Sequence, residues 1–534
     1  MKAYGPSMLI DHGVIHTLAP DCPHAEAMLI EAGQVTWIGK SADAPRAGRV
    51  IDVQGRTVLP ALIDAHSHLY WMAEDRLQCS VASADIRNIP DLLERLRAEA
   101  TSKDGSEWLV AVGANEFRLL EGRLPTREEL DRISDGRPVA VKRTCGHAVV
   151  ANSAALERIG IGDDTPDPYG GIIERDQGRP NGVLRERAAE LLLRQLPTPS
   201  TQAVVASLES VAQSYLACGV AGATEAAVGF TATFDREWQV WESVRRHGSF
   251  PLRMAFMLRT SPADAAARAV RPSGIDLDWQ VDALKFFADG TVGSRSAAVS
   301  QPYEGSLCGC GLFMQTPEQL SADILCATQA GWHIAVHAIG DRGIDLTAEI
   351  FQAVRRSHAG LPRLRVEHLA MPSQAALRRL KQTLTIVVPQ HAFLREMGDG
   401  FVSTLGVERA ERLYPGRSLL DHGLTVAGSS DAPASSMSPF VGIAAAMSRS
   451  TRSGRVLNAG ERITAREAIE MYTTGAAAAA GHGNARGILR PGAVADAIVL
   501  DRDPLQSTAE EILAIRVEAT IVRGRVAYEN WAQR

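Results

Sequence analysis

Apolar and polar positions divide the chain into a long central part and two shorter ends. In the central part, short apolar runs alternate with stretches of helical periodicity such as Ala203–Ala217, Pro317–Ala330 and Arg466–Tyr472, which is the pattern of a parallel α/β arrangement. Several of the apolar runs are apolar on both faces, as expected for strands buried between a barrel interior and outer helices. Residues 58–485 are therefore predicted to form a TIM-like (β/α)8 barrel. Its eight predicted strands are Val58–Ile63, Val220–Thr224, Leu252–Met257, Val281–Phe287, His333–Val336, Leu364–Val366, Leu384–Val388 and Leu424–Ala427.

The two ends of the chain carry short β-rich runs separated by turn residues. These runs flank the long central part, so they predict one small composite β-sandwich domain that residues 1–57 and 486–534 build together. Gly39-Lys40-Ser41 resembles the end of a phosphate-binding loop. Gln34 stands where the earlier glycine is required, however, so a strand and a turn are expected there. The predicted terminal strands are Met8–Thr17, Ala27–Ile30, Gln34–Ile38, Ala497–Leu500 and Ala519–Val522.

The separation between the first two predicted barrel strands is too long for one βα unit, which takes on the order of 30 residues. Residues from about 72 to 200 are therefore predicted to be a large insertion after the first barrel strand. The insertion has β-rich runs of its own at Leu109–Gly113 and Val139–Lys142. Because it follows the first strand directly, it is expected to cap the mouth of the barrel.

Composition and charge exclude several classes of protein. Apolar residues make up 45% of the 534 and charged residues 22%, with a formal net charge of −6, as in an ordinary globular protein. There is no long basic block, so nucleic acid is not expected as a partner. Asp11 and His12 interrupt the first apolar stretch, which argues against a signal peptide, and no apolar run is long enough to span a membrane. The seven cysteines are spread thinly, which favours free thiols in the cytoplasm, and a homodimer is the default expectation for a soluble enzyme.

Polar residues cluster at or just beyond the C-terminal ends of the predicted barrel strands, where barrel enzymes place their active sites. His66 and His68 follow the first strand. In a strand, residues i and i+2 point to the same side, so these two histidines can bind one ion. Single residues stand at the ends of strands four, five, six and eight: Lys285, His337, His368 and Asp431.

Each of these residues also has an ordinary structural interpretation. The two histidines could be a hydrogen-bonded pair in a turn, and Asp431, in Gly428-Ser-Ser-Asp-Ala-Pro, could be an ordinary turn aspartate. The order of all six at successive strand ends favours a metal centre over six separate structural roles. Three further structural alternatives are contacts with a nearby carboxylate. His337 could be hydrogen-bonded to Asp341, His368 could pair with Glu367, and Lys285 could form an ion pair with Asp289.

The same residues stand in segments that resemble the amidohydrolase superfamily. Val58–His68 is similar to its first barrel strand, and Gly487–Leu500 is similar to its closing strands. The departures are Ala61, where the family usually has glycine, and Asn181, where relatives often carry threonine. The resemblance runs from about residue 8 to residue 525. Six further segments look like the branch that contains N-substituted formamide deformylase (amidohydrolase family 3): Leu284–Gly290, His337–Arg342, Val366–Leu369, Gly428–Pro433, Arg123–Asp131 and Gly146–Leu156.

The resemblance implies a centre with two divalent metal ions, zinc being the expected metal, and no other cofactor. His66 and His68 would bind the more buried ion, His337 and His368 would bind the other, and Lys285 would bridge them as a carbamate. Asp431 would bind the first ion and act as the catalytic proton shuttle. The chemistry is coherent, because a buried lysine has a lowered pKa and its neutral amine can capture carbon dioxide. Zinc suits imidazole and carboxylate ligands and acidifies bound water.

We therefore expect a metal-dependent amidohydrolase that cleaves a C–N bond other than a peptide bond in a small molecule, such as an N-substituted formamide or a related amide. His147, Trp71 and Phe393 are expected to bind the substrate, and His147 could help to polarise the carbonyl. Tyr70, Phe117 and Tyr303 complete a partly aromatic mouth, although simple packing between insertion and barrel would explain the aromatic residues equally well.

Other activities stay open at this point. One is hydrolysis of a urea, carbamate or ester. Another is deamination at a site with one metal ion; Lys285 argues against it, because a site with one ion needs no bridging lysine. A non-catalytic barrel used for ligand binding or regulation would usually have lost some of the ligands that this chain keeps.

Overall fold

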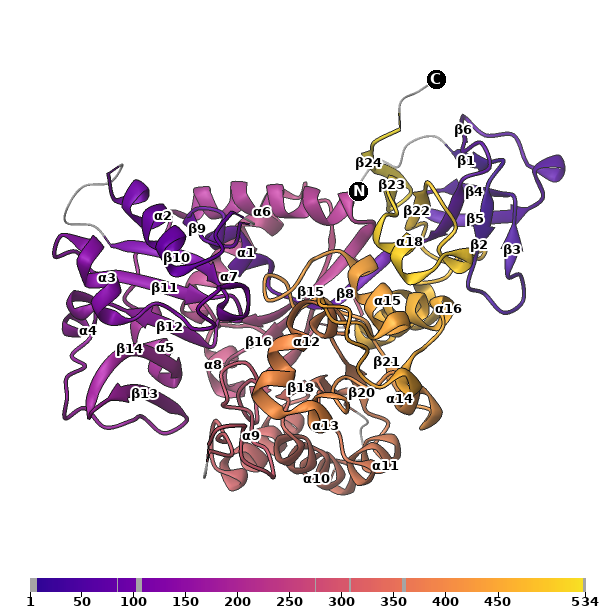
Figure 1. The fold of residues 1–534 in the computed structure, drawn as a ribbon. Helices are drawn as coiled ribbons and strands as arrows, with labels where there is room; N and C mark the ends of the chain where they lie inside the picture. Colours follow the sequence, from indigo (N-terminus) through magenta and orange to yellow (C-terminus); the bar gives the residue numbers. More distant parts are fainter. Residues whose placement is uncertain are drawn as a thin grey trace.

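A computed structural model describes residues 7–83, 85–101, 108–273, 275–306, 309–357 and 362–531. At its centre lies a curled sheet of eight parallel strands with helices packed around it (Figure 1). Each of the eight predicted runs contributes to one of these strands, and the strands follow chain order across the sheet. They are β8 (Leu62–Ser67), β15 (Val220–Val228), β16 (Arg253–Leu258), β17 (Trp279–Phe287), β18 (His333–Ala338), β19 (Leu364–His368), β20 (Ile386–Val388) and β21 (Thr425–Val426).

Helices connect the strands and bury their apolar sides against the sheet in one continuous core. Five of the described helices that lie between strands of the central sheet begin after a serine or threonine whose side chain accepts a hydrogen bond from the N–H three residues later, which caps the helix. These caps are Ser200, Thr233, Ser261, Thr316 and Ser373. The helices that they start are α6 (Thr201–Ala217), α7 (Phe234–His247), α8 (Pro262–Ala267), α9 (Pro317–Gln329) and α11 (Gln374–Gln382). Further helices are α1 (Leu69–Asp75), α10 (Asp341–Ser357), α12 (Ala392–Leu405), α13 (Val407–Ala410), α14 (Arg417–Asp421), α15 (Pro439–Ser448), α16 (Ala465–Glu470), α17 (Ala476–Ala479) and α18 (Ala509–Leu513).

The curl of the sheet brings its first and last strands together. The N–H of Ala65 donates to the carbonyl of Gly428 at 3.2 Å, and the N–H of Asp431 donates to the carbonyl of His66 at 2.8 Å. The carboxylate of Asp64 accepts hydrogen bonds from the N–H and the hydroxyl of Ser430, at 3.0 and 2.5 Å. These contacts hold the segment after β21 beside the end of β8.

The first predicted barrel strand, Val58–Ile63, is wrong in one respect, because it contains parts of two strands. β7 (Thr57–Pro60) belongs to a sheet built from the ends of the chain, and the central sheet begins only with β8. The N–H of Ala61 donates to Asp496 of the terminal region, whereas the next N–H, of Leu62, donates to Gly219 beside β15. The run is apolar throughout because it passes from one buried core into another, so hydrophobicity alone does not mark the change of sheet.

The two ends of the chain form two sheets with a shared core. One is ordered β24-β23-β22-β7-β2-β3 and therefore combines strands from both ends, and the other is ordered β5-β4-β1-β6. Ile10 and Ile30 from the first part of the chain pack with Val499 and Ile521 from the last part. At Gly39-Lys40-Ser41, the segment that resembles the end of a phosphate-binding loop, β5 ends at Gly39 and a three-residue helical turn follows at Ser41–Asp43. A strand and a turn were predicted there. The strands are β1 (Met8–Asp11), β2 (Val14–His16), β3 (His24–Ala25), β4 (Ala27–Glu31), β5 (Gln34–Gly39), β6 (Arg49–Asp52), β22 (Ala497–Leu500), β23 (Val517–Val522) and β24 (Arg525–Glu529).

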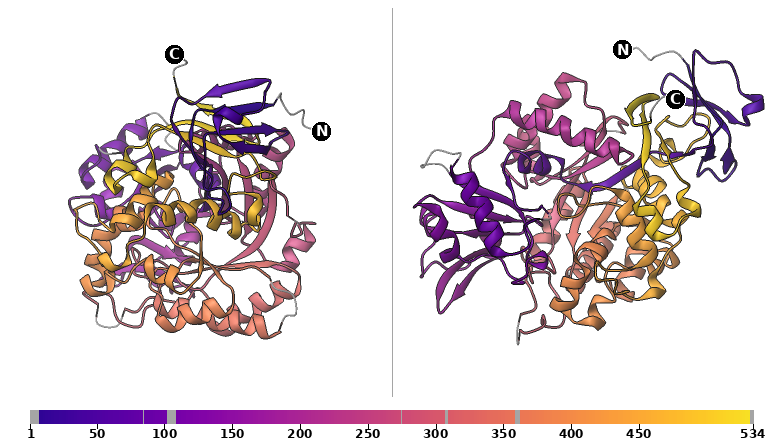
Figure 2. Two further views of the ribbon diagram at one scale, coloured as in Figure 1. Left: turned by 90° about the vertical axis from the view of Figure 1, so that its right-hand side faces the viewer. Right: turned by 45° about the horizontal axis from the view of Figure 1, so that its top comes forward.

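The segment between α1 and α6 has a sheet of its own, ordered β13-β14-β12-β11-β10-β9. Its side chains alternate between two cores: Leu109 and Ala111 face one, Val110 and Val112 the other, as the two-residue period of a strand requires. This sheet and the terminal sheets lie on opposite sides of the central sheet (Figures 1 and 2). Its elements are β9 (Cys79–Ser80), α2 (Ile89–Thr101), β10 (Leu109–Ala114), α3 (Arg127–Ser134), β11 (Val139–Arg143), β12 (Ala148–Ala151), α4 (Ser153–Arg158), β13 (Gly171–Asp176), β14 (Arg179–Glu186) and α5 (Arg187–Leu193).

Across the described ranges, we find no helix with the length and apolar character needed to cross a membrane.

Candidate active site

One cavity at the C-terminal end of the central sheet collects all six residues predicted to bind metal. The strand ends supply them: His66 from β8 and His68 directly after it, Lys285 from β17, His337 from β18 and His368 from β19, while Asp431 follows β21. The carboxyl ends of parallel strands meet at one edge of a sheet, which is why residues far apart in the sequence converge here.

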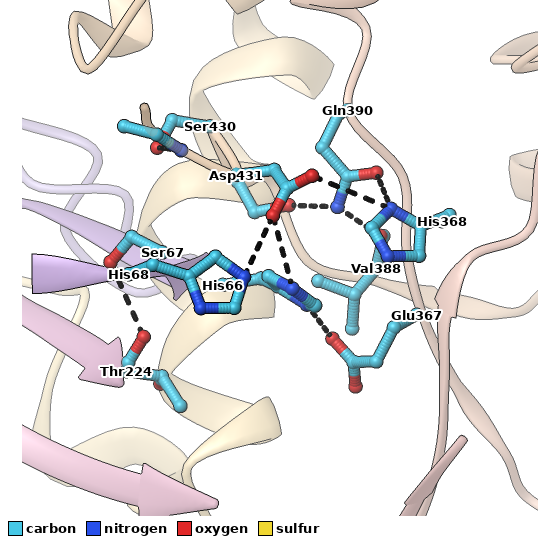
Figure 3. Close-up of polar contacts among 12 residues, drawn as sticks. His66, Ser67, His68, Thr224, Glu367, His368, Val388, Gln390, Ser430 and Asp431 are labelled. Carbon is cyan, nitrogen blue, oxygen red and sulfur yellow. Dashed lines mark hydrogen bonds and ion pairs between the residues drawn. The ribbon is translucent and has the colours of Figure 1, made fainter. Parts of the chain in front are cut away.

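Asp431 contacts both His66 of β8 and His68 directly after it (Figure 3). Its Oδ1 is 3.3 Å from Nε2 of His66 and 3.2 Å from Nε2 of His68. One ligand atom from each of the three residues falls within 4.8 Å of the others, a grouping that could hold a metal ion. Burial raises the pKa of a carboxyl group, but here the hydrogen bonds with His66 and His68 outweigh burial and hold the pKa of Asp431 well below its usual range.

His66 is oriented from behind by a buried carboxylate. Glu367, the residue before His368, lies 2.5 Å from Nδ1 of His66 through its Oε2 (Figure 3). Arg365 in turn donates from Nε to Oε1 of Glu367 at 2.8 Å and from Nη2 to the carbonyl of Ala65 at 2.7 Å. A carboxylate that accepts the Nδ1 proton fixes the ring with Nε2 toward the cavity, where Nε2 would be the ligand atom once a metal ion takes the place of its proton.

The other two histidines are also held by one ring nitrogen. Nδ1 of His368 lies 2.7 Å from Oε1 of Gln390, and Nε2 of His337 lies 3.1 Å from the carbonyl of Gly290. Their ring centroids are 4.4 Å apart. Burial lowers the pKa of His368 to about 3 and that of His337 well below its usual range, so both imidazoles are neutral near pH 7, the form that binds metal.

The structural alternatives for His337, His368 and Lys285 are wrong, because their supposed partners are bonded elsewhere. Asp289 accepts hydrogen bonds from three backbone N–H groups, those of Ala298, Ile339 and Gly340. Asp341 binds Ser300, and Glu367 binds His66 and Arg365 rather than His368.

Lys285 makes no ion pair within 4.0 Å among the described residues, and its Nζ lies 5.3 Å from the centroid of the Phe287 ring. Burial lowers the pKa of Lys285 to about 8, so a substantial fraction of its amine is neutral at mildly alkaline pH.

The three predicted substrate-binding residues do not share one cavity. His147 and Phe393 line the cavity of the six ligands. Trp71 instead lines a neighbouring cavity, which shares Phe230 with the first. It lies behind His68, with ring centroids 5.6 Å apart, because α1 turns its side chain away from the six ligands. Of the other predicted mouth residues, Tyr70 and Tyr303 are buried in cores, which is the packing alternative.

Several residues of the cavity were not predicted from the sequence. Phe230 and Phe287 stack on each other with centroids 5.8 Å apart and form one wall. Glu186, from the end of β14, lies 2.7 Å from Nδ1 of His147. Burial disfavours the charged form of His147, but the Glu186 carboxylate outweighs it and raises the pKa of His147 to about 9. Pairs of this kind join residues of different elements, and no local sequence pattern indicates them.

Comparison with known proteins agrees with this geometry. The sequence profile of the amidohydrolase family matches residues 49–528. The chain belongs to the amidohydrolase family. It is 31% identical to N-substituted formamide deformylase of Arthrobacter pascens over 528 residues, which cover 95% of each protein. It is also 27% identical to the putative amidohydrolase YtcJ of Bacillus subtilis (strain 168), over 97% of this chain and 98% of that one.

A solved structure shows the same amidohydrolase fold. It is that of an uncharacterized metal-dependent hydrolase from Pyrococcus horikoshii OT3, with a TM-score of 0.74 and 24% identity, over 94% of this chain and 99% of that one. This protein is thus a hydrolase of the amidohydrolase family, whose members act on C–N bonds, and a metal-dependent mechanism fits the family.

The side chains in the cavity suit the divalent metal that the family implies. The donors are imidazole nitrogens and carboxylate oxygens, which zinc and similar ions prefer. Burial lowers the pKa of His68 to about 4, so a metal does not have to displace a proton from this imidazole near neutral pH. Glu367 provides His66 with the carboxylate partner that is typical behind metal-binding histidines.

Proposed function

We propose that this amidohydrolase hydrolyses an amide-type C–N bond of a small molecule, an N-substituted formamide or a related amide. The observation that carries the proposal is the convergence of six side chains of the appropriate types on one cavity, five of them buried and the sixth, Asp431, 13% exposed. The relative named N-substituted formamide deformylase supports the choice of bond. The closed (β/α)8 arrangement and a capping role for the insertion belong to the same proposal, and Arg143, Cys145 and His147 of the insertion line the cavity.

We further propose that the site holds two zinc ions. His66 and His68 would bind one, His337 and His368 the other, and Lys285 would join them as a carbamate, with Asp431 on the first ion. The lowered pKa of Lys285, about 8, supports the carbamate, because only a neutral amine attacks carbon dioxide. When bound, the metal supplies Lewis acidity, which activates water near neutral pH and polarises the carbonyl of the substrate.

The protein's own residues then account for the proton transfers. Asp431 is ionised over the whole neutral range, so it can accept the proton that water loses on attacking the carbonyl carbon. As the C–N bond breaks, Asp431 passes this proton to the leaving nitrogen, and acid and amine are released. His147 is cationic below about pH 9 because of Glu186, and it can donate a hydrogen bond to the oxygen on which negative charge develops.

A comparison of substrates tests the proposed bond. The zinc-loaded protein should hydrolyse an N-benzyl formamide with a higher kcat/KM than a benzyl ester, a phenylurea or a benzyl carbamate. A clear preference for the urea or the carbamate would assign a different C–N substrate to the same centre. Lack of activity on all four compounds, with two metal ions bound, would overturn the proposed substrate class.

The pair of His147 and Glu186 predicts a specific pH profile. Because the pKa of His147 is raised to about 9, the charged form present below that pH is lost as the pH rises through 9, and kcat/KM should fall there. In His147→Ala, kcat/KM at pH 7.5 should be about 10–100-fold lower, the alkaline limb should disappear, and the metal content should stay unchanged. An unchanged alkaline limb would show that another group titrates. Loss of metal would make His147 a ligand.

A further inference from the structure

A buried guanidinium in the cavity is not used by the proposed chemistry. Arg143 stands at the end of β11 in the insertion, with 1% of its surface exposed, and its side chain is part of the wall that the six ligands also line. Nε donates to Oε1 and Oε2 of Glu116, at 3.0 and 2.8 Å, and the guanidinium also has the Cys145 side chain as a hydrogen-bond partner. Nη2 is fully buried and has no hydrogen-bond partner in the described part of the chain.

The guanidinium is held rigidly in this place. Its Cζ lies 5.6 Å from the centroid of the Phe117 ring, which covers one face. Gly293 lies against the terminal nitrogens, and a Cβ at that position would stand 2.6 Å from Nη2 and 3.1 Å from Nη1. A glycine there leaves room for the charged group beside the backbone, so the arginine cannot be regarded as a loose surface side chain.

Such a group is unfavourable unless a ligand completes it. Guanidinium carries five N–H donors, and buried donors that lack an acceptor oppose folding. Glu116 and the Cys145 side chain take up part of these donors, which leaves Nη2, unpartnered among the described residues, for an oxygen acceptor that enters the cavity. Arginine matches a carboxylate in both shape and charge.

The apolar part of the cavity wall indicates which chemical group the ligand carries besides its carboxylate. Phe393, Met397 and Phe401, all from α12, line the cavity and pack in one apolar cluster. A ligand that satisfies both surfaces has an apolar group and a carboxylate on the same side of the scissile bond.

We propose that Arg143 is a specificity-determining residue that binds the carboxylate of an N-formyl or N-acyl amino acid with an apolar side chain. The inference rests on the proposed function, because it assigns the carboxylate to the amine portion of the amide. It gives the amine portion of the N-substituted formamide a charged group that the protein binds. Arg143 acts in binding and takes no part in the proton transfers.

The test compares two formamides that differ only in the carboxylate. For N-formylphenylalanine against N-phenethylformamide, the wild-type protein should show at least about a hundredfold higher kcat/KM for the carboxylate, because a site built for a hydrogen-bonding group rejects an analogue that lacks it. In Arg143→Met the preference should fall below about fivefold, with the neutral formamide changed little. Equal kcat/KM values for the two compounds in the wild-type protein would overturn the proposal. So would an equal loss for both compounds in the variant.

Two further variants separate recognition from stability. Arg143→Met combined with Glu116→Gln removes both charges of the pair, so no carboxylate is left unpaired, and it should show the same loss of preference as the single variant. Arg158→Met is the matched control, since Arg158 also lies over an aromatic ring of the insertion, that of Trp108 at 5.7 Å, and does not line the cavity. It should keep the wild-type preference. Loss of preference in this control would show that the effect is a general one on the insertion.

A binding measurement separates this inference from the proposed function. In the zinc-loaded Asp431→Asn protein, calorimetry should show that N-formylphenylalanine binds at least about tenfold more tightly than N-phenethylformamide, and that Arg143→Met removes the difference. If the wild-type protein hydrolyses neither compound but this difference is found, the proposed reaction fails and the role of Arg143 stands. If activity on formamides is found without any dependence of binding on Arg143, the reaction stands and the role of Arg143 fails.

Discussion

Asp431→Asn should leave the fold intact and lower kcat on the order of a thousandfold or more. Asparagine keeps the shape of the side chain and its hydrogen bonds but cannot take up the proton that must reach the leaving nitrogen. The backbone at Asp431 has a φ of +55°, a left-handed conformation that asparagine tolerates better than most other residues. The substitution therefore changes the chemistry with little backbone strain.

Two measurements establish whether the loss comes from proton transfer. The thermal unfolding midpoint should stay within a few degrees of the wild-type value, and elemental analysis should still find metal, because His66 and His68 remain. A variant that retains a tenth of the wild-type kcat would remove Asp431 from the role of proton shuttle.

Lys285→Ala should lower the metal content from about two ions per chain to about one and abolish most of the activity. The buried amine of Lys285 lies among the histidines of both proposed ions and has no carboxylate within 4.0 Å in the described part of the chain. We therefore expect Lys285 to bridge the two ions after it has formed a carbamate. A short-chain carboxylic acid should restore part of the activity in the variant, because its two oxygens can replace those of the carbamate.

The matched control is Lys381→Ala, an exposed lysine whose Nζ donates to the carbonyl of Gly423 on the outside of the fold. It should keep wild-type metal content and activity. Unchanged metal stoichiometry in Lys285→Ala would contradict the bridging role and leave a mononuclear centre as the simpler interpretation.

The central sheet and the side chains at its strand ends could be predicted from the sequence because both depend on local patterns. A short apolar run followed by a polar residue, as at His337 or His368, shows where a strand ends and what stands there. The strand prediction failed at Val58–Ile63, where β7 and β8 are joined without a polar break. Hydrophobicity records burial and does not record which sheet buries a residue.

The contacts that orient the site could not be predicted, because they join distant segments. Glu367 stands next to the proposed ligand His368 in the sequence, yet its carboxylate is hydrogen-bonded to Nδ1 of His66, which belongs to another strand. The placement of Trp71 depends on the direction of α1 after His68, and neither composition nor spacing encodes that direction. That Nη2 of Arg143 has no partner among the described residues appears only when the positions of Glu116 and Gly293 are known.

The position of β7 in the terminal sheet has a consequence for synthesis of the chain. β7 pairs with β2 on one side and with β22 on the other, and it lies directly before β8, which carries His66 and leads into His68. Ribosomes add roughly 5–20 residues per second, so the interval between synthesis of β7 and of β22 is on the order of tens of seconds. Throughout that interval one edge of β7 has no partner, and an open edge of this kind pairs readily with other chains. A ribosome that stops before residue 497 therefore leaves a nascent protein with an unpaired sheet edge next to the segment that carries His66 and His68.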